Sequence, residues 1–339
     1  MILITGTTGL VGTHLLAKLL DKNDPKNIRG LYRTEEKMEF CLAVIHRVYG
    51  KNTYNLAKQI NWHKTNITEL PSLEKSFHKV SFVYHCAGLI SNSPSERNLL
   101  RKVNIEGTAN VVNLAIDYKV EKLCHVSSIA TLGSNKEKGF VDEDSYRENL
   151  NNSSFYSIAK YGGEMEVWRA SQEGLDVVII NPGVILGEGF YENGSGEIVK
   201  QAAKKFPFKI EKTTGFIGVK DVVEAMLVLM SSKTKNQRFI LIERNMKMSD
   251  VQTLFAKNLD VKQPHVKLRK WMLYFYWIFD VILSSITRKK RKISFDVIPT
   301  LLEDRIYSNE KAKKELNMEF TPIEKVIESC CKDYKNTLD

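Results

Sequence analysis

Cysteine is scarce in this sequence, and its five cysteines form an odd set without a C-x-x-C pair. Such a set implies neither structural disulfides nor a zinc cluster, so we predict no metal site and a cytoplasmic protein. Long hydrophobic runs are also missing. Because no stretch of about 18 uncharged apolar residues occurs, a membrane-spanning helix is not expected. No basic segment precedes the first apolar run, so no secretory signal peptide is expected either.

Positive charge is present in excess, but it is concentrated in one segment. The net charge is +10, and the segment from Lys267 to Lys292 contains eight basic residues and one acid, which leaves +3 for the rest of the chain. A nucleic-acid-binding protein needs a broader basic face on a recognition module. The sequence shows neither, so we predict no nucleic-acid partner.

Short apolar runs alternate with helix-length stretches through the first two-thirds of the chain. Continuous Val and Ile runs separated by helices indicate strands buried on both faces, and therefore a parallel sheet with crossover helices. We predict an α/β fold. The expected strands are 2–4, 28–32, 82–84, 123–126 and 177–180, and the expected helices are 10–20, 99–116 and 156–173.

The alternation loosens after Pro182. We therefore predict a main domain over 1–182 and a smaller mixed C-terminal substrate lobe over 183–212 and 244–339. The segment 213–243 is expected to return to the main domain, because its apolar end resembles one more strand. The smaller lobe is expected to cover the carboxyl edge of the sheet.

A glycine-rich turn follows the first strand at once and opens a helix. Its glycines at 6, 9 and 12 permit a tight turn, close approach of the backbone to a pyrophosphate, and close helix–strand packing. The helix N-terminus then offers free N–H groups to an anion. The pattern predicts a dinucleotide site, and the alternative is an ordinary strand–helix turn that needs small residues.

The end of the second strand distinguishes NADP from NAD. An NAD site places an acid there for the ribose hydroxyls, whereas a basic residue suits a 2′-phosphate. Arg33 stands at this position, with Glu35 and Glu36 close behind. We predict NADP as the favoured cofactor, although the two acids oppose this preference.

Further motifs follow in a fixed order. They are 84–88 after a strand, 104–108 on the next helix, Val126-Ser127-Ser128, Tyr156-x-x-x-Lys160 and 181–187. Together with the glycine turn, these motifs resemble the extended short-chain dehydrogenase/reductase family, also called the NAD-dependent epimerase/dehydratase family. The resemblance covers nearly the whole chain. It implies a Rossmann domain with a doubly wound parallel sheet.

The catalytic set implied by the resemblance is Ser128, Tyr156 and Lys160. A separation of four residues places the last two on one helix face. A nearby ammonium group is expected to lower the pKa of Tyr156, which then acts as general acid or base toward a carbonyl or alcohol. Ser128 would bond the same oxygen, with Ser127 as the alternative. Lys160 would also hold the nicotinamide ribose.

The resemblance further implies which residues lie along the cofactor. Asn66 stands where the family often has Asp, and His85 is expected to be a packed structural residue rather than a base. The implied cofactor-binding residues are Gly6, Thr8, Gly9, Leu10, Val11, Gly12, Arg33, Asn66, Ile67, Cys86, Ala87, Gly88, Asn104, Tyr156, Lys160, Pro182, Gly183 and Val184.

Val184 indicates the branch of the family. Nucleotide-sugar epimerases typically carry Asn there to bind the diphosphate, and Val cannot make that polar contact. The stretch 181–187 resembles the dihydroflavonol-reductase and 3β-hydroxysteroid-dehydrogenase-like branch. We therefore predict hydride transfer on a small, mostly apolar carbonyl or alcohol substrate. A nucleotide-sugar epimerase or dehydratase and a non-catalytic NADP sensor are the alternatives, and family members often form homodimers.

The stretch 271–283 is aromatic-rich and apolar nearly all round, with basic residues on both sides. It fits a buried helix of the smaller lobe. It also fits an interfacial helix on anionic lipid, with 267–292 as the contacting segment, because Trp, Tyr and flanking Lys and Arg favour headgroups. A lid or dimer face is the third alternative.

Overall fold

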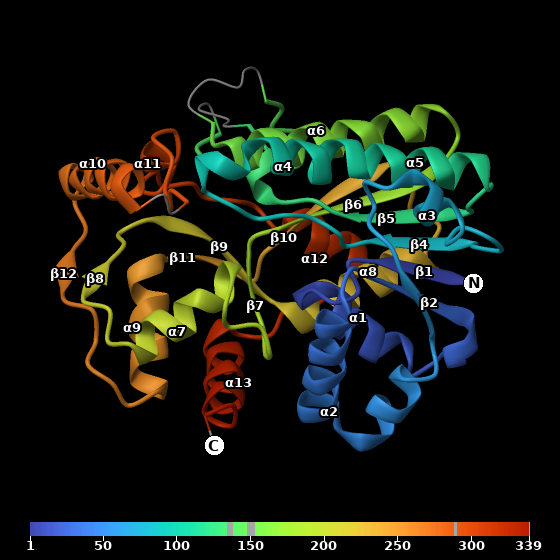
Figure 1. Cartoon of the computed structure of the whole chain (residues 1–339), viewed down its shortest axis with the longest axis horizontal. Coiled ribbons are helices and arrows are strands. Elements are labelled where there is room, and N and C mark those ends of the chain that lie inside the picture. The colour runs from blue at the N-terminus through green and yellow to red at the C-terminus, as the bar shows by residue number, and fades with distance from the viewer. Residues whose placement is uncertain (134–137, 148–152, 288–289, 339) are drawn as a thin grey trace.

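A seven-stranded parallel sheet forms the centre of the larger part of the protein (Figure 1). The computed structural model describes residues 1–133, 138–147, 153–287 and 290–338. The strand order is β10-β6-β5-β4-β1-β2-β3, and every neighbouring pair is parallel, which confirms the predicted α/β fold. The strands are β1 (Ile2–Thr5), β2 (Ile28–Tyr32), β3 (Asn61–Lys64), β4 (Phe82–His85), β5 (Lys122–Val126), β6 (Asp176–Pro182) and β10 (Gln237–Leu241).

Both faces of this sheet are buried. Leu3 and Val177 pack into one apolar core, whereas Ile4 and Val178 pack into another, and all four side chains are fully buried. Because successive side chains of a strand point to opposite faces, only an unbroken apolar run satisfies both cores. The edge strand β3 is half-buried and mostly polar, which is why apolar runs did not predict it.

Helices cover the two faces of the sheet. One layer lies over the core that contains Leu3, and the other lies over the core that contains Ile4 (Figure 1). The first layer has α3 (Leu70–Glu74), α4 (Arg97–Arg101), α5 (Gly107–Asp117) and α6 (Phe155–Gln172), and a π-helical turn (Lys102–Glu106) joins α4 to α5. The second layer has α1 (Leu10–Leu19), α2 (Glu35–Ala57), α8 (Val219–Ser231) and α12 (Glu310–Leu316).

A smaller mixed lobe lies beside the main sheet, as expected. Its core contains Phe216, Phe255 and Ile327. The lobe has β7 (Val184–Leu186), β9 (Thr213–Gly218) and β11 (Arg244–Lys247) in one sheet, and β8 (Phe208–Lys209) with β12 (Val266–Lys267) in another. Its helices are α7 (Glu197–Ala203), α9 (Met248–Asn258), α10 (Lys270–Thr287), α11 (Val297–Thr300) and α13 (Ile323–Lys335).

The chain crosses between the two parts several times. Within 213–243, α8 packs on the main sheet and β10 forms its edge, whereas β9 joins the smaller sheet. Helix α12 belongs to 244–339 by sequence, yet Ala312 and Leu316 pack into the main core. The division into a nucleotide-binding domain and a substrate lobe therefore stays a proposal, with β9 in the smaller part.

All strands of the main sheet end at the same edge because they are parallel. Thr5 pairs with His85, and His85 with His125, so the segments that follow β1, β4 and β5 start side by side. The strand order reverses at β1, and in open α/β sheets ligands bind at such a switch point, beyond the carboxyl ends of the strands. The residues implicated by the sequence motifs follow these strand ends.

Candidate active site

The glycine turn between β1 and α1 is tight and closely packed. Gly6 has a φ of +66°, and a Cβ on it would lie 2.6 Å from the Ala87 nitrogen. A Cβ on Gly12 would collide with the Gly6 carbonyl oxygen. Both positions therefore require glycine, for the left-handed backbone in one case and for close packing in both.

The N-terminus of α1 is open to an anion. Gly9 is the N-cap and supplies no side-chain cap, and no acidic residue lies in the first turn. Gly9 is exposed, and the only heavy atom near its absent side chain is the Gly6 carbonyl oxygen at 3.4 Å. The N–H groups of Leu10 and Val11 and the positive end of the helix therefore suit a pyrophosphate.

Two basic side chains lie at the end of β2. Arg33 is exposed there, and its charge, after burial, contributes to lowering the pKa of Lys37. Glu35 does not oppose them, because its carboxylate accepts a hydrogen bond from the Tyr32 hydroxyl (3.1 Å) and pairs with Lys64 (3.5 Å). Arg33 was identified from the sequence, but Lys37, which follows four residues later in the first turn of α2, was missed.

The segment after β4 approaches the glycine turn, and the segment after β3 carries Asn66 and Ile67. Cys86 N and Ala87 N donate to the backbone oxygen and the hydroxyl of Thr5, each at 3.2 Å. Asn66 accepts from the Thr68 N–H (3.3 Å), and Ile67 is buried. Small side chains after β4 thus hold the backbone close to β1, as the predicted cofactor contact requires.

Asn104 braces the loop that follows β4. Its Oδ1 accepts from the Leu89 N–H (2.8 Å), and its Nδ2 donates to the Leu89 carbonyl (2.9 Å). The residue lies in the π-helical turn, a distortion that is frequent at functional sites. A Cβ on Gly88 would lie 3.4 Å from Asn104 Oδ1 and 3.8 Å from Lys160 Nζ. Asn104 thereby fixes the backbone beside Lys160. Its direct contact with a cofactor stays a prediction.

Helix α6 carries Tyr156 and Lys160 on one face near its start. Ser154 caps the helix by accepting the Ser157 N–H (3.2 Å). Lys160 is only 6% exposed, and its Nζ donates to the Val126 carbonyl (2.8 Å) at the end of β5. Burial lowers the pKa of Lys160 to about 8, although the nearby Glu164 carboxylate acts in the opposite direction.

Ser128 lies next to Tyr156. Its Oγ accepts the Ala130 N–H (3.1 Å), which leaves the hydroxyl proton available for donation. Burial raises the pKa of Tyr156, and a hydrogen bond with Ser128 lowers it. The expectation that Lys160 lowers the pKa of Tyr156 is wrong for this structure, because burial dominates and the ammonium is directed at Val126.

The sequence did not reveal Glu164, whose carboxylate is the centre of a buried hydrogen-bond network next to these residues. It is fully buried on α6, one helical turn beyond Lys160. Its Oε2 accepts from Ser127 (2.5 Å), Thr131 (2.7 Å) and Asn181 (2.9 Å), and its Oε1 pairs with Arg238 (3.1 Å). Since Ser127 is occupied here, Ser128 is the better placed of the two serines. The four-residue spacing of Tyr156, Lys160 and Glu164 was the only sequence signal.

Two histidines at the strand ends are structural. His85 is fully buried, and its ring nitrogens bond the hydroxyls of Thr5 (2.7 Å) and Thr108 (3.0 Å). Burial lowers its pKa to about 3. The neighbouring His125 ring lies 5.0 Å away and has no hydrogen-bond partner among the described residues. His85 is therefore neutral and packed, as expected, rather than a general base.

The junction of β6 and β7 lies at the carboxyl edge of the main sheet as well. Gly183 N donates to the Leu241 carbonyl (3.0 Å), and a Cβ on Gly183 would collide with the Gly215 backbone. Pro182 ends β6 and is buried, whereas Val184 is half-buried. An apolar side chain, with no polar group to offer, thus stands at position 184.

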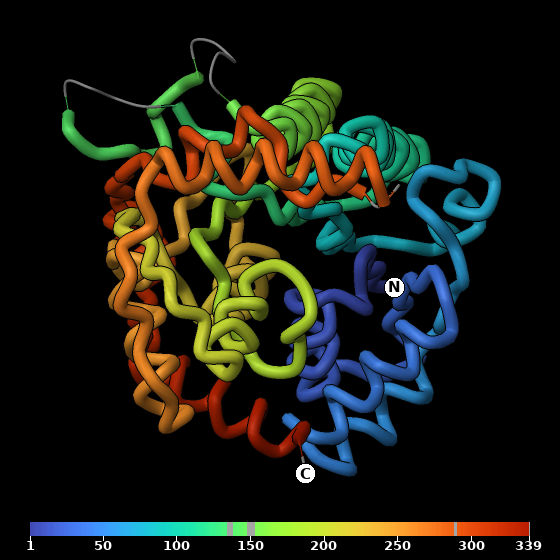
Figure 2. The backbone as a smooth tube through the Cα atoms, turned by 60° about the vertical axis from the view of Figure 1, so that its left-hand side comes forward, coloured from blue at the N-terminus to red at the C-terminus, as the bar shows by residue number. Residues whose placement is uncertain are grey.

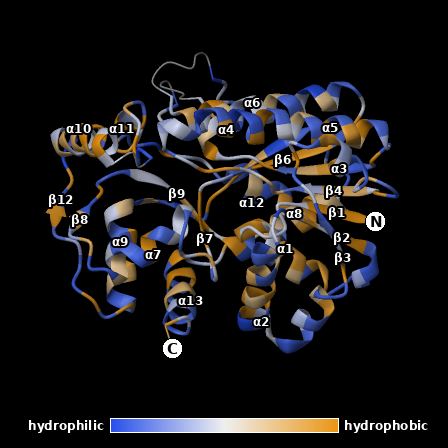
Figure 3. Cartoon of the chain, in the orientation of Figure 1, coloured by the Kyte–Doolittle hydropathy of each residue, from blue (hydrophilic) through white to orange (hydrophobic). Residues whose placement is uncertain are grey.

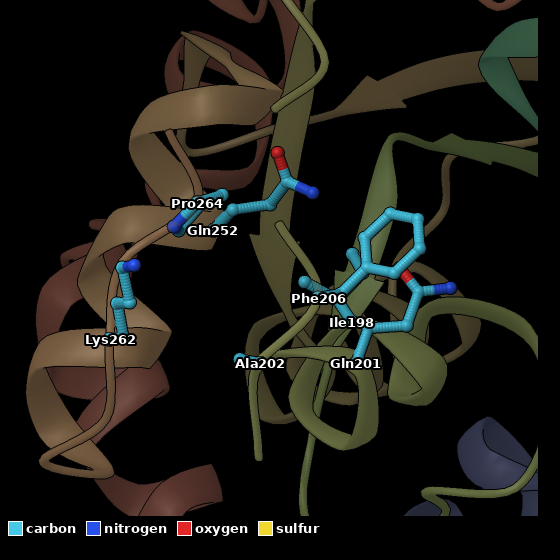
Figure 4. Close-up of a pocket in the computed structure, with 7 residues that line it drawn as sticks. All are labelled: Ile198, Gln201, Ala202, Phe206, Gln252, Lys262 and Pro264. Carbon is cyan, nitrogen blue, oxygen red and sulfur yellow. The ribbon is translucent and has the colours of Figure 1, made fainter. Parts of the chain in front are cut away.

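The part of the chain that the structure describes holds no metal cluster, and its pocket in the smaller lobe is very small. Within those residues, no group of three or more His, Cys, Asp or Glu side chains is arranged to hold a metal. The pocket in Figure 4, lined by Ile198, Phe206 and Gln252 among others, encloses about 10 Å³, room for at most one water molecule. It lies in the smaller lobe and contains none of the predicted site residues.

Comparison with known proteins identifies the family and the fold. The model of the NAD dependent epimerase/dehydratase family matches residues 2–241. The chain is 24% identical over 341 residues to "Putative dihydroflavonol 4-reductase" of Synechocystis sp., covering 98% of this chain and 94% of that protein. It is 25% identical over 291 residues to cinnamoyl-CoA reductase 2 of Medicago truncatula, covering 79% and 82%. The crystal structure of yeast methylglyoxal/isovaleraldehyde reductase complexed with NADPH has a similar fold, with a TM-score of 0.73, 19% identity, and 99% and 98% coverage.

Proposed function

The chain belongs to the NAD dependent epimerase/dehydratase family and is an NAD(P)-dependent enzyme, and we propose that it is an NADP-dependent oxidoreductase. It transfers hydride between the nicotinamide and a carbonyl or alcohol group of a small, mostly apolar substrate. Its relatives include enzymes named as reductases of dihydroflavonol and cinnamoyl-CoA, which supports this reaction class.

The observation that carries the proposal is the convergence of Ser128, Tyr156 and Lys160. Ser128 follows the carboxyl end of β5, whereas Tyr156 and Lys160 lie near the start of α6, with Lys160 Nζ beside Gly88. The uncapped start of α1 belongs to the same edge of the sheet. The turn suits the phosphates of a dinucleotide. The hydroxyls of Ser128 and Tyr156 and the amine of Lys160 are therefore proposed to face the bound dinucleotide.

In the direction of reduction, Tyr156 donates its phenolic proton to the substrate oxygen. The Ser128 hydroxyl donates a hydrogen bond to the same oxygen, because its own lone pair is used by Ala130 N–H. The nicotinamide, when bound, supplies the hydride to the carbonyl carbon. Lys160, whose Nζ donates to the Val126 carbonyl, would hold the nicotinamide ribose, as the family resemblance implies. Oxidation of an alcohol uses the same groups in reverse.

The preference for NADP is proposed from the two basic side chains at the end of β2. Burial and, after it, the charge of Arg33 lower the pKa of Lys37, and a 2′-phosphate would relieve the repulsion between the two cations. Glu35, which would favour a ribose diol, is occupied by Tyr32 and Lys64. The charges at this position thus complement a phosphate rather than two hydroxyls.

Substrate class is tested by a screen of carbonyl compounds, with lipophilic ketones and aldehydes included, that follows NADPH absorbance. Tyr156→Phe is expected to lose about 10²–10⁴-fold in kcat on an accepted substrate while it still binds NADPH. Tyr161→Phe is the matched control, because it removes a hydroxyl from the next residue of α6. Full turnover of Tyr156→Phe would contradict the proposed role.

Nucleotide sugars form the second arm of the screen. Epimerisation or dehydration of such a sugar, without turnover of any simple carbonyl compound, would replace the proposal by the epimerase alternative. NADPH binding without turnover of either class would indicate a sensor instead.

Cofactor choice is tested by measuring dissociation constants for NADPH and NADH. Arg33→Ala/Lys37→Ala is expected to weaken NADPH binding by about a hundredfold or more while NADH binding changes little, since each of the two charged hydrogen bonds contributes about 1.5–3 kcal/mol. Wild-type protein that binds NADH at least as tightly as NADPH would refute the preference.

A further inference from the structure

Helix α10 turns its apolar side chains away from the protein. Five of them recur at intervals of three or four residues and therefore share one helix face. They are between 53% and 75% exposed. This outer face consists of Trp271, Phe275, Phe279, Ile282 and Ile286. The core-helix alternative for 271–283 is therefore wrong.

The inner face of the same helix contains its only acidic residue. Asp280 is 7% exposed, and its carboxylate accepts the N–H groups of Lys292 (3.0 Å) and Ile293 (3.5 Å). Leu273 is buried beside it. A surface helix in water normally places its apolar stripe inward and its charges outward. Helix α10 packs Leu273 and Trp277 inward against an apolar cluster, buries Asp280, and still leaves a second apolar face outward, so this outer face suits an apolar medium.

Basic residues precede and follow this helix in the sequence. The segment from Lys267 to Lys292 holds +7 of the total charge of +10, and its single acid is the buried Asp280. Lys267, Arg269 and Lys270 are exposed and form no ion pair with any residue that the structure describes. An apolar strip inside a basic border is complementary to lipid acyl chains below anionic headgroups.

A second copy of the chain fits this face poorly. In a two-fold contact the same patch meets itself. Because both ends of α10 are basic, either orientation of the paired helices brings positive charge against positive charge. A homodimer through other helices, which the family resemblance implies, is a separate proposal.

We propose that α10 docks this protein onto anionic membrane surfaces, lying in the plane of the headgroups with its outer face inserted. Eighteen residues give a helix of about 27 Å, and among the described residues none of the helices has the length and hydropathy to cross a bilayer. Trp271 and Tyr276 add the aromatic groups that favour the headgroup region.

Helix α10 lies on the same side of the molecule as helix α6, which carries Tyr156 and Lys160 (Figure 2). Asp296 accepts the Phe155 N–H (3.1 Å), one residue before Tyr156. Ser93, in the segment after β4, donates to the Arg291 carbonyl (2.5 Å). Figure 3 shows the hydrophobic colouring of α10 at this end of the molecule. A docked protein would therefore hold this side of its active site near the bilayer, although docking itself does not depend on the proposed reaction.

Vesicle flotation tests the proposal on the full-length protein. At low salt, wild-type protein is expected to float with phosphatidylcholine vesicles that contain phosphatidylglycerol, and less with pure phosphatidylcholine. Phe275→Ser/Phe279→Ser is expected to weaken binding about tenfold or more. Leu70→Ser is the matched control, because Leu70 is an exposed apolar residue on α3, 47% exposed.

Charge is tested separately. Lys267→Glu/Lys270→Glu is expected to weaken binding to anionic vesicles about tenfold, whereas Lys22→Glu/Lys26→Glu, an equal charge change at exposed positions elsewhere, leaves it largely intact. The emission of wild-type protein is expected to shift to shorter wavelength on binding, and Trp271→Phe removes most of that shift.

Three results would overturn the proposal. One is the absence of binding to anionic vesicles at low salt, and another is binding that the α10 variants and their controls reduce equally. The third is light scattering in which Phe275→Ser/Phe279→Ser converts a dimer to a monomer, since a second copy would then cover the outer face.

Discussion

Glu164→Gln is the substitution that most directly probes the buried centre below the active site. The carboxylate accepts hydrogen bonds from Ser127, Thr131 and Asn181 on one oxygen and pairs with Arg238 on the other. A glutamine amide can accept on only one side, and its NH₂ group would face donors on the other. The Arg238 guanidinium, in a residue only 8% exposed, would also lose its counter-charge.

The magnitude follows from these contacts. Removing one partner of a buried ion pair costs about 3–5 kcal/mol, which is a large part of a total stability of about 5–15 kcal/mol. The free energy of unfolding of Glu164→Gln is therefore expected to fall by about 3–5 kcal/mol. Because the surface exposed on unfolding is unchanged, the urea midpoint should fall while the m-value stays constant.

The matched control is Glu166→Gln on the same helix. Glu166 pairs with Arg169 at 2.9 Å, but both side chains are partly exposed, and such pairs contribute at most about 1 kcal/mol. Equal midpoints for the two variants would refute the inference that Glu164 is a buried structural charge. A double variant with Arg238→Met should be less destabilised than the sum of the single changes.

Two further predictions concern stability measured by urea unfolding. Gly12→Ala is expected to cost about 1–3 kcal/mol because its Cβ would collide with the Gly6 carbonyl. Gly9→Ala, whose Cβ would lie at an ordinary 3.4 Å from that oxygen, should change stability by less than about 0.5 kcal/mol, and equal effects would contradict the geometry. Burial lowers the pKa of Lys160 to about 8 from an ordinary 10.5, so between these values the unfolded chain binds more protons and stability rises with pH. The free energy of unfolding of the wild type, minus that of Lys160→Met, should therefore rise by up to about 3 kcal/mol from pH 8 to pH 10.5. A value that does not change with pH would refute the lowered pKa.

Local patterns predicted much of the fold. The run Val177–Ile180 was recognisable as a strand because all four side chains had to be apolar to fill the two cores. Strand β3 was not predicted, because an edge strand can be half-buried and polar. The glycine turn was readable because Gly6 and Gly12 meet steric demands within a few residues or at an adjacent strand end.

The candidate site was predicted where its members are close in sequence or follow a strand end. Tyr156 and Lys160 are one helical turn apart, and Ser128 follows β5 directly. Lys37 was missed because it becomes relevant only when α2 places it beside Arg33. The pKa of Tyr156 was predicted in the wrong direction, because sequence spacing does not reveal burial.

The sequence by itself determined the parallel sheet, the phosphate-binding turn and the spacing of the Tyr–Lys pair, since each depends on short-range periodicity or on glycine sterics. Only the tertiary structure decided that Glu164 meets Arg238, 74 residues away, at the base of the site. It also decided which side of α10 faces outward, because a helix that is apolar nearly all round has no preferred face until Asp280 finds its partners. Contacts between distant segments depend on how the whole chain packs, and no local pattern contains that information.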